Sequence, residues 1–166
     1  MRITALRRPA RAPGRARGQS LVEFALVLIP LLTLILGVVQ FGLIFNSYVT
    51  MTNAAREGAR TGTIYVYDRL LSPEQNDTAR NAAIRASVVG SMNLLAKTSP
   101  QFADGDLTIT YARPTAVPDS DARKGQTVTV RVTYHQELII PLIAELLPKD
   151  TNGRLALPGE VTMVIN

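Results

Sequence analysis

The sequence predicts an α+β fold, in which a long N-terminal transmembrane helix precedes a small head with one helix packed on an antiparallel sheet. Three observations carry this prediction. Residues 24–45 form an uncharged and mostly apolar run. Residues 84–95 repeat apolar side chains at helical spacing. Residues 126–134 alternate between polar and apolar side chains, as a strand with one buried face does.

The run from Phe24 to Phe45 is long enough to cross a membrane. A helix of this length covers roughly 33 Å, and the hydrocarbon core of a bilayer is about 30 Å thick. A buried core helix is one alternative, but so small a domain offers little to surround it on all sides. A secretory signal peptide is another, but its apolar region is only about 7–15 residues long.

The positive charge of the chain lies at its N-terminus. The 166 residues carry a formal net charge of +5, and residues 1–18 contain six arginines and no acid, so the remainder is nearly neutral. Basic proteins often bind nucleic acid, whose phosphates must be neutralised. Because no basic stripe lies beyond this leader, we expect no nucleic-acid partner. Arginines beside a first span stay in the cytoplasm, which predicts a head outside.

Glu23 is a carboxylate directly before the apolar run. An acid at the centre of a membrane helix costs about 2.5–3.5 kcal/mol, and less near its ends. The simple alternative is a solvated acid that interacts favourably with the helix dipole. A cut after Gly18 would create an amino terminus at Gln19, one helical turn before Glu23. Ammonium and carboxylate could then neutralise each other, within one subunit or between neighbours.

These residues resemble a known family. A basic leader, Gly18, Glu23 five residues later and an unbroken apolar helix resemble the class III prepilin signal of type IV pilins and pseudopilins. More specifically, GQSLVEFALVLIPLLTLILGVVQFG, followed by AAREGAR at 54–60, resembles the TadE-like proteins of the tight-adherence (Flp) pilus system. The resemblance is strong over residues 14–62 and diffuse over 63–166.

The resemblance implies a pilin-like head, a prepilin peptidase cut between Gly18 and Gln19, and an assembly role for Glu23. It implies as partners the membrane, the prepilin peptidase, other pilins or pseudopilins and the inner-membrane pilus assembly platform. The expected location is the bacterial inner membrane, with a cytoplasmic N-terminus and a periplasmic or extracellular C-terminal domain. The expected divisions are a cleaved leader (1–18), the transmembrane helix with its juxtamembrane extension (19–62) and the exterior domain (63–166).

Beyond the membrane run, the helix is expected to continue to about Arg60. Small residues recur there every four positions, which lets another backbone approach closely. The residues of this stripe are Ala54, Gly58 and Gly62, with Ala55 and Ala59 beside them. We interpret the stripe as a packing face against the domain or a partner. The alternative is a flexible juxtamembrane segment in which glycine simply terminates the helix. Glu57 and Arg60 are spaced to form an ion pair.

The head is expected to begin with a helix over about 73–96, capped by Ser72 and Gln75. Its apolar face would consist of Ile84, Val88, Met92 and Leu95. The remaining expected elements follow in order: a turn at 104–106, a strand at 107–111, a polar loop at 114–125, a strand at 126–134, an apolar stretch at 138–147 that covers the sheet or touches the membrane surface, and a strand pair or one broken strand at 154–165, interrupted by Pro158 and Gly159.

Little in the sequence points to catalysis. The chain has no cysteine, one histidine (His135) and no nucleophile, phosphate-binding or zinc motif. His135 is interpreted as a surface or hydrogen-bonded residue. The acid pairs Asp104/Asp106 and Asp119/Asp121 are interpreted as turn formers, with a weak calcium site as the alternative. We therefore expect no enzyme, cofactor or metal. Two functions remain: a minor pseudopilin, or a permanently anchored module that binds another pilus or secretion-assembly component.

Overall fold

The computed structural model describes residues 14–92, 106–113 and 123–166. It confirms the α+β class, with a long apolar N-terminal helix, a second long helix and a three-stranded antiparallel sheet. The contacts divide the chain into two compact units, Met1–Val39 and Gln40–Asn166. Each unit is described separately, and the second is called the head.

The described part of the first unit is helical and consists of the first residues of α1 (Gly14–Thr63). From Gly18 onward, α1 is long and apolar enough to cross a membrane, and its most apolar stretch has no buried residues. Large side chains such as Leu26 and Val38 are exposed all around it. A helix that is apolar on every side suits lipid rather than water. The helix also continues through Pro30 and on to Thr63, as expected beyond Phe45.

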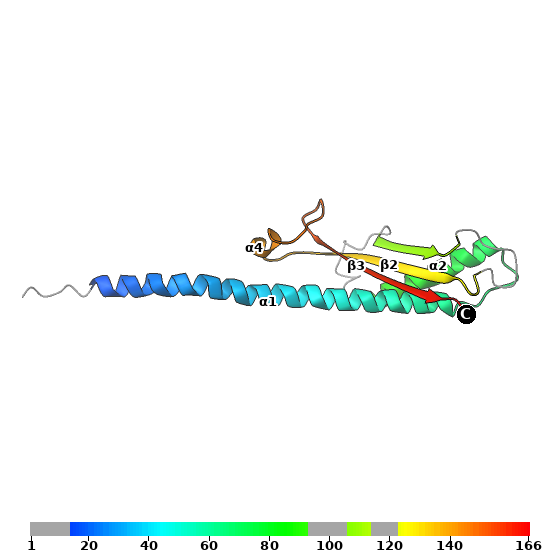
Figure 1. The fold of residues 1–166 in the computed structure, drawn as a ribbon, viewed down its shortest axis with the longest axis horizontal. Helices are drawn as coiled ribbons and strands as arrows, with labels where there is room; N and C mark the ends of the chain where they lie inside the picture. Colours follow the sequence, from blue (N-terminus) through cyan, green and yellow to red (C-terminus); the bar gives the residue numbers. More distant parts are fainter. Residues whose placement is uncertain (1–13, 93–105, 114–122) are drawn as a thin grey trace, which may run out of the picture. The chain divides into compact units, whose positions relative to one another are not determined.

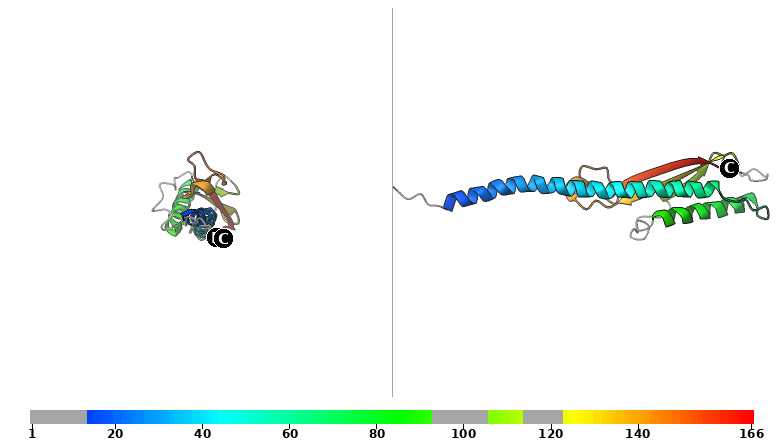
Figure 2. Two further views of the ribbon diagram at one scale, coloured as in Figure 1. Left: turned by 90° about the vertical axis from the view of Figure 1, so that its left-hand side faces the viewer. Right: turned by 90° about the horizontal axis from the view of Figure 1, so that it is seen from below.

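The head has two layers. Residues 40–63 of α1 and α2 (Pro73–Met92) cover one face of the sheet, which contains β1 (Leu107–Tyr111), β2 (Thr127–Gln136) and β3 (Leu155–Val164) in the order β1-β2-β3 (Figures 1 and 2). A single helical turn, α4 (Pro141–Ala144), lies between β2 and β3. The hydrophobic core between the layers draws on both helices and all three strands.

The central strand forms as its alternating sequence predicts. Val128, Val130, Val132 and Tyr134 are buried against the helices, while Arg131 is exposed on the other face. In the antiparallel register Val130 lies opposite Ile109 of β1 and opposite Val161 of β3. The strand expected at 107–111 is confirmed residue for residue.

The last strand differs from its expectation. A strand pair or a broken strand was expected at 154–165, but β3 is continuous and pairs with β2 through both Pro158 and Gly159. β3 is an edge strand, where a missing N–H need not break the ladder. Gly159 leaves room for α1, because a Cβ there would lie 2.9 Å from Met51 Cε.

Helix α2 begins at the predicted capping box. The Ser72 backbone N–H donates to Gln75 Oε1 at 2.9 Å, and the Gln75 N–H donates to Ser72 Oγ at 3.2 Å. On the predicted apolar face, Ile84, Val88 and Met92 are fully buried. Leu95 and the expected helix end lie outside the described residues, as do Asp104, Asp119 and Asp121.

Candidate functional site

Gly18 lies within α1 and is exposed. A Cβ built at this position would meet nothing within 4 Å. Packing among the described residues therefore does not require glycine here, although glycine inside a helix costs roughly 0.5–1 kcal/mol relative to alanine. Its local effect is a helix that unwinds more easily at the Gly18-Gln19 bond.

Gln19 and Glu23 lie together on one face of α1. The Gln19 side-chain Nε2 donates to Glu23 Oε1 at 3.1 Å, and both residues are exposed. The spacing of four residues therefore brings a group at position 19 within reach of the carboxylate. A positive charge at this position would find its counter-charge one turn away.

The five small residues of α1 lie on the side of this helix that packs against the rest of the head. Ala54, Ala55 and Ala59 are fully buried in its core. A Cβ on Gly58 would overlap Val88 Cγ2 of α2, and one on Gly62 would lie 2.8 Å from Ile84 Cδ1. The close approach of α1 to α2 thus depends on glycine, which has no side chain, at positions 58 and 62. Beside this face, Glu57 and Arg60 form the predicted ion pair, with 3.1 Å between Oε2 and Nε.

Two polar residues that sequence reasoning missed anchor α1 to the end of β2. Gln40 and Ser47, two helical turns apart, are almost completely buried. Gln40 Oε1 accepts a hydrogen bond from the Ile139 N–H at 2.9 Å, and Ser47 Oγ donates to Gln136 Oε1 at 2.6 Å. The available signal was that Gln40 and Thr33 are the only polar side chains in the run 24–45.

A buried polar network joins α2 to the loop before β2. Asp77 Oδ2 lies 2.6 Å from Arg123 Nη2 and Asp77 Oδ1 lies 3.9 Å from Arg80 Nη1, with both arginines almost fully buried. The Arg123 guanidinium stacks 4.1 Å from the centre of the Tyr111 ring, whose hydroxyl donates to Asn81 Oδ1 at 2.6 Å. Burial raises the pKa of Tyr111 to about 12. The network holds α2, β1 and the loop before β2 together, and Asn81 also lines an open hollow of about 410 Å³ between α2 and β1.

His135 has hydrogen-bonding partners on both sides of its ring. Its Nδ1 lies 2.8 Å from Asp150 Oδ2, and its Nε2 lies 3.3 Å from Asp106 Oδ1. The backbone N–H of Arg154 is the main cause that lowers the pKa of Asp150. Over the part of the chain that the structure describes, no group of three or more His, Cys, Asp or Glu is placed to hold a metal ion.

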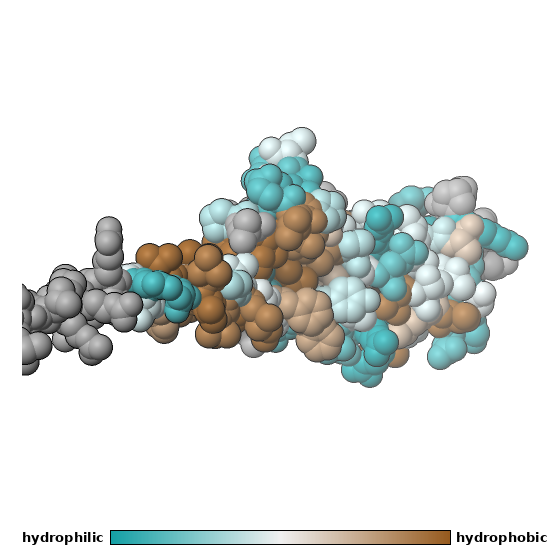
Figure 3. Space-filling model, turned by 60° about the vertical axis from the view of Figure 1, so that its left-hand side comes forward, coloured by the Kyte–Doolittle hydropathy of each residue, from teal (hydrophilic) through white to brown (hydrophobic). Residues whose placement is uncertain are grey.

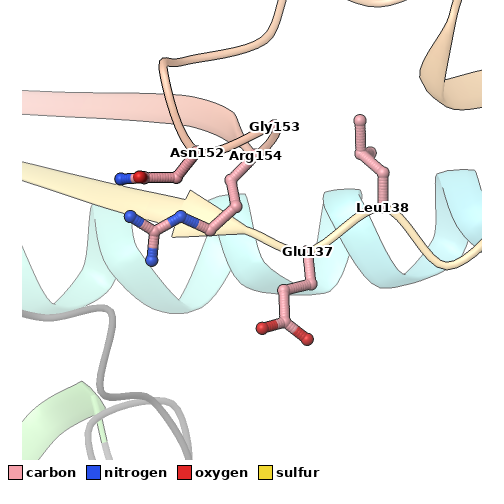
Figure 4. Close-up of a pocket in the computed structure, with 5 residues that line it drawn as sticks. All are labelled: Glu137, Leu138, Asn152, Gly153 and Arg154. Atoms are coloured by element: carbon pink, nitrogen blue, oxygen red, sulfur yellow. The ribbon is translucent and has the colours of Figure 1, made fainter.

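An open hollow of about 560 Å³ lies near the end of β2 (Figure 4). Its lining comprises Glu137, Leu138, Asn152, Gly153 and Arg154. The carboxylate of Glu137 and the guanidinium of Arg154 point in different directions, and Leu138 points away from both. General acid-base or nucleophilic catalysis needs groups that converge on a reacting atom, and these side chains do not converge.

Comparison with protein families gives a match to the first part of the chain. The family model described as TadE-like protein matches residues 18–60, which contain the Gly18-Gln19 bond, Glu23, the apolar run and most of the small-residue stripe. The match confirms the resemblance that the sequence indicates for this part of the chain. No curated protein and no solved structure matches.

Proposed function

We propose that this chain, whose residues 18–60 match the TadE-like family, is a minor pseudopilin: a structural or assembly subunit of a tight-adherence pilus that a prepilin peptidase processes between Gly18 and Gln19. The observation that carries the proposal is the arrangement at the start of α1. A glycine that packing does not require, a carboxylate one turn after the proposed cut, and an exposed apolar helix follow one another directly.

Cleavage would change the charge at the helix start in two ways. It would remove six arginines, which otherwise hold the N-terminus on the cytoplasmic side. It would also create an ammonium group on Gln19, the residue whose side chain already reaches Glu23. An ion pair between the two, in one subunit or across neighbours, would lower the cost of moving Glu23 into an apolar environment. The processed helix could then leave the bilayer for a helical bundle.

We also propose a membrane topology for the chain. The helix would cross the bacterial inner membrane once, with the leader in the cytoplasm and the head in the periplasm or in the assembled pilus. The partners would be the peptidase, other pilins or pseudopilins, and the assembly platform of the inner membrane.

The proposal is tested by co-expressing the full chain with an active or a catalytically inactive prepilin peptidase and determining the N-terminal residue by mass spectrometry. We expect a chain that begins at Gln19 with the active enzyme and at Met1 with the inactive one. Gly18→Leu should abolish cleavage, because it places a branched side chain beside the cut. Gly14→Leu, a matched change within the leader, should leave cleavage intact.

An intact Met1 terminus in the presence of active peptidase would contradict the pseudopilin proposal. That result would favour the second function, a permanently anchored module whose head binds another pilus or secretion-assembly component. Cleavage of both glycine variants at the wild-type rate would instead remove the role given to Gly18.

A further inference from the structure

The segment from Leu138 to Leu147, which contains α4, presents apolar side chains to the outside of the head. Ile139 is 69% exposed and Leu146 is 81% exposed. The segment carries one charged residue, Glu145, which is paired with Lys149 at 2.8 Å. Ten residues are too few to span a bilayer, and an exposed apolar segment of this kind marks a contact with another apolar phase or surface.

The position of this segment along α1 is fixed by a hydrogen bond. The Ile139 N–H donates to Gln40 Oε1, and the views in Figures 1 and 2 place the segment beside the first residues of α1 that belong to the head. Counted from Glu23, a hydrocarbon core of about 30 Å requires about 20 helical residues. The far boundary of the core would then lie near Ile44, beyond Gln40, so Ile139 is held close to that boundary.

The surface of α1 at this level is also apolar. Phe41 and Phe45, which follow Gln40 on α1, are exposed, and so is Tyr48 about one turn after Phe45; aromatic residues commonly mark the membrane interface. The next charged residue of α1 after Glu23 is Arg56. Figure 3 shows hydrophobic surface on α1 and a hydrophobic patch on the head. Within the head, the part of α1 that follows Gln40 therefore exposes apolar side chains, as the segment does.

Five backbone N–H groups of the segment have hydrogen-bond partners within the protein. The N–H of Ile139 is bonded to Gln40, and the N–H groups of Ile143, Ala144, Glu145 and Leu146 donate to carbonyls within the segment. Pro141 has no N–H to satisfy. Polar backbone groups that enter the apolar part of a bilayer must find partners within the protein, and these groups have them.

From these observations we infer that residues 138–147 form a membrane foot: they insert their apolar side chains into the lipid leaflet that faces the head, at the boundary between headgroups and hydrocarbon. The inference rests on the proposed crossing of the membrane by α1. The foot would set the height and rotation of the head relative to the membrane, because it gives the head a second attachment beside the helix.

The chain contains no tryptophan, so a single introduced tryptophan can report how deeply its position lies in the membrane. The variants Ile139→Trp and Leu146→Trp alter exposed side chains of the foot, Leu32→Trp marks the span, and Val66→Trp marks an exposed site after the end of α1. Each full-length variant is reconstituted into phosphatidylcholine and phosphatidylglycerol vesicles, with or without brominated phosphatidylcholine, which quenches tryptophan fluorescence on contact.

We expect Ile139→Trp and Leu146→Trp to lose at least half as much fluorescence as Leu32→Trp, and Val66→Trp to keep its intensity. Quenching of Leu32→Trp alone would overturn the foot and leave the proposed span standing. The absence of quenching at Leu32 would contradict the span as well. A third outcome is a tryptophan in the foot that is shielded from water but is not quenched. If it becomes exposed when the protein is diluted in lipid, a second copy of the chain covers this surface. That result would also overturn the foot.

Discussion

At the scale of single residues, the glycines of α1 serve different purposes. Gly58 is dictated by packing, because Val88 occupies the space that its side chain would need. Gly18 faces open space, so packing among the described residues does not account for it. The contrast separates a glycine that packing in the head requires from one for which we propose a role in processing.

Gly58→Ala should destabilise the head. The new methyl group overlaps Val88 Cγ2, and overpacking of a core costs about 1–3 kcal/mol. The measurement is the free energy of unfolding of the full chain in detergent micelles. The matched control is Gly90→Ala in α2, where a Cβ meets nothing within 4 Å, and which should be neutral or stabilising by up to about 1 kcal/mol.

The same prediction can be checked by coupling. In a Val88→Ala background, which removes the overlapping methyl, Gly58→Ala should cost less than in the wild type. Equal costs in the two backgrounds, or a Gly58→Ala variant as stable as Gly90→Ala, would refute the contact as the reason for this glycine.

The raised pKa of Tyr111 predicts that the folded protein loses stability in alkaline solution. Burial raises its pKa from 10.0 to about 12, so the unfolded chain releases this proton at lower pH than the folded one. The stabilising contribution is complete below pH 10.0 and is lost as the pH rises towards about 12. Unfolding free energies measured across this range should fall less steeply for Tyr111→Phe than for the wild type. Identical slopes would show that Tyr111 does not cause the loss.

At the scale of elements, α1 is one continuous helix whose two parts have different surroundings. Up to Val39 it exposes apolar side chains on all sides, and from Gln40 onward one face enters the core of the head. Gln40 and Ser47 mark the change, because they are buried polar residues that bond to the end of β2 and the segment after it. The anchor therefore couples the helix to the proposed foot.

Gln40→Leu should release Ile139 from α1. The variant keeps a bulky side chain but removes the acceptor of the Ile139 N–H, and the loss of a typical hydrogen bond costs about 0.5–1.5 kcal/mol. Hydrogen exchange of the Ile139 amide should accelerate. The control is Thr33→Val, since the Thr33 hydroxyl donates to the Ile29 carbonyl of its own helix. Unchanged protection of Ile139 in Gln40→Leu would count against the anchor.

At the scale of the whole molecule, the processing and assembly that we propose are separate steps that would depend on neighbouring residues. Gly18 and Gln19 would be recognised before the chain joins a pilus. Glu23 would act afterwards, when the new ammonium group requires a partner. Each step can therefore fail without the other.

Glu23→Ala should be cleaved normally but incorporated poorly into pili. Removing the carboxylate leaves the cut intact while the Gln19 ammonium loses its counter-charge. The measurement compares processed protein in cells with protein in sheared pili. Glu57→Ala, an acid of the same helix that pairs with Arg60 outside the apolar run, should assemble as the wild type does. Equal incorporation of both variants would remove the assembly role of Glu23.

Local patterns in the sequence determined much of this protein. The uncharged run predicted the exposed helix, the alternation around Val130 predicted the central strand, and Ser72 with Gln75 predicted the start of α2. These features depend on spacing within a few residues, and the physics of helix, strand and cap acts over the same distance. The TadE-like resemblance also lies in one local segment, residues 18–60.

Only the tertiary structure decided which surfaces meet. It assigned the small residues of α1 to the head's own core, and it made β3 continuous because Pro158 lies on an edge strand and Gly159 lies under Met51. It also paired Gln40 with Ile139, 99 residues away. Such contacts depend on how separate elements pack, and no periodicity within one segment encodes them. The Gly18-Gln19-Glu23 arrangement is local and could be predicted, whereas the anchor of the foot could not.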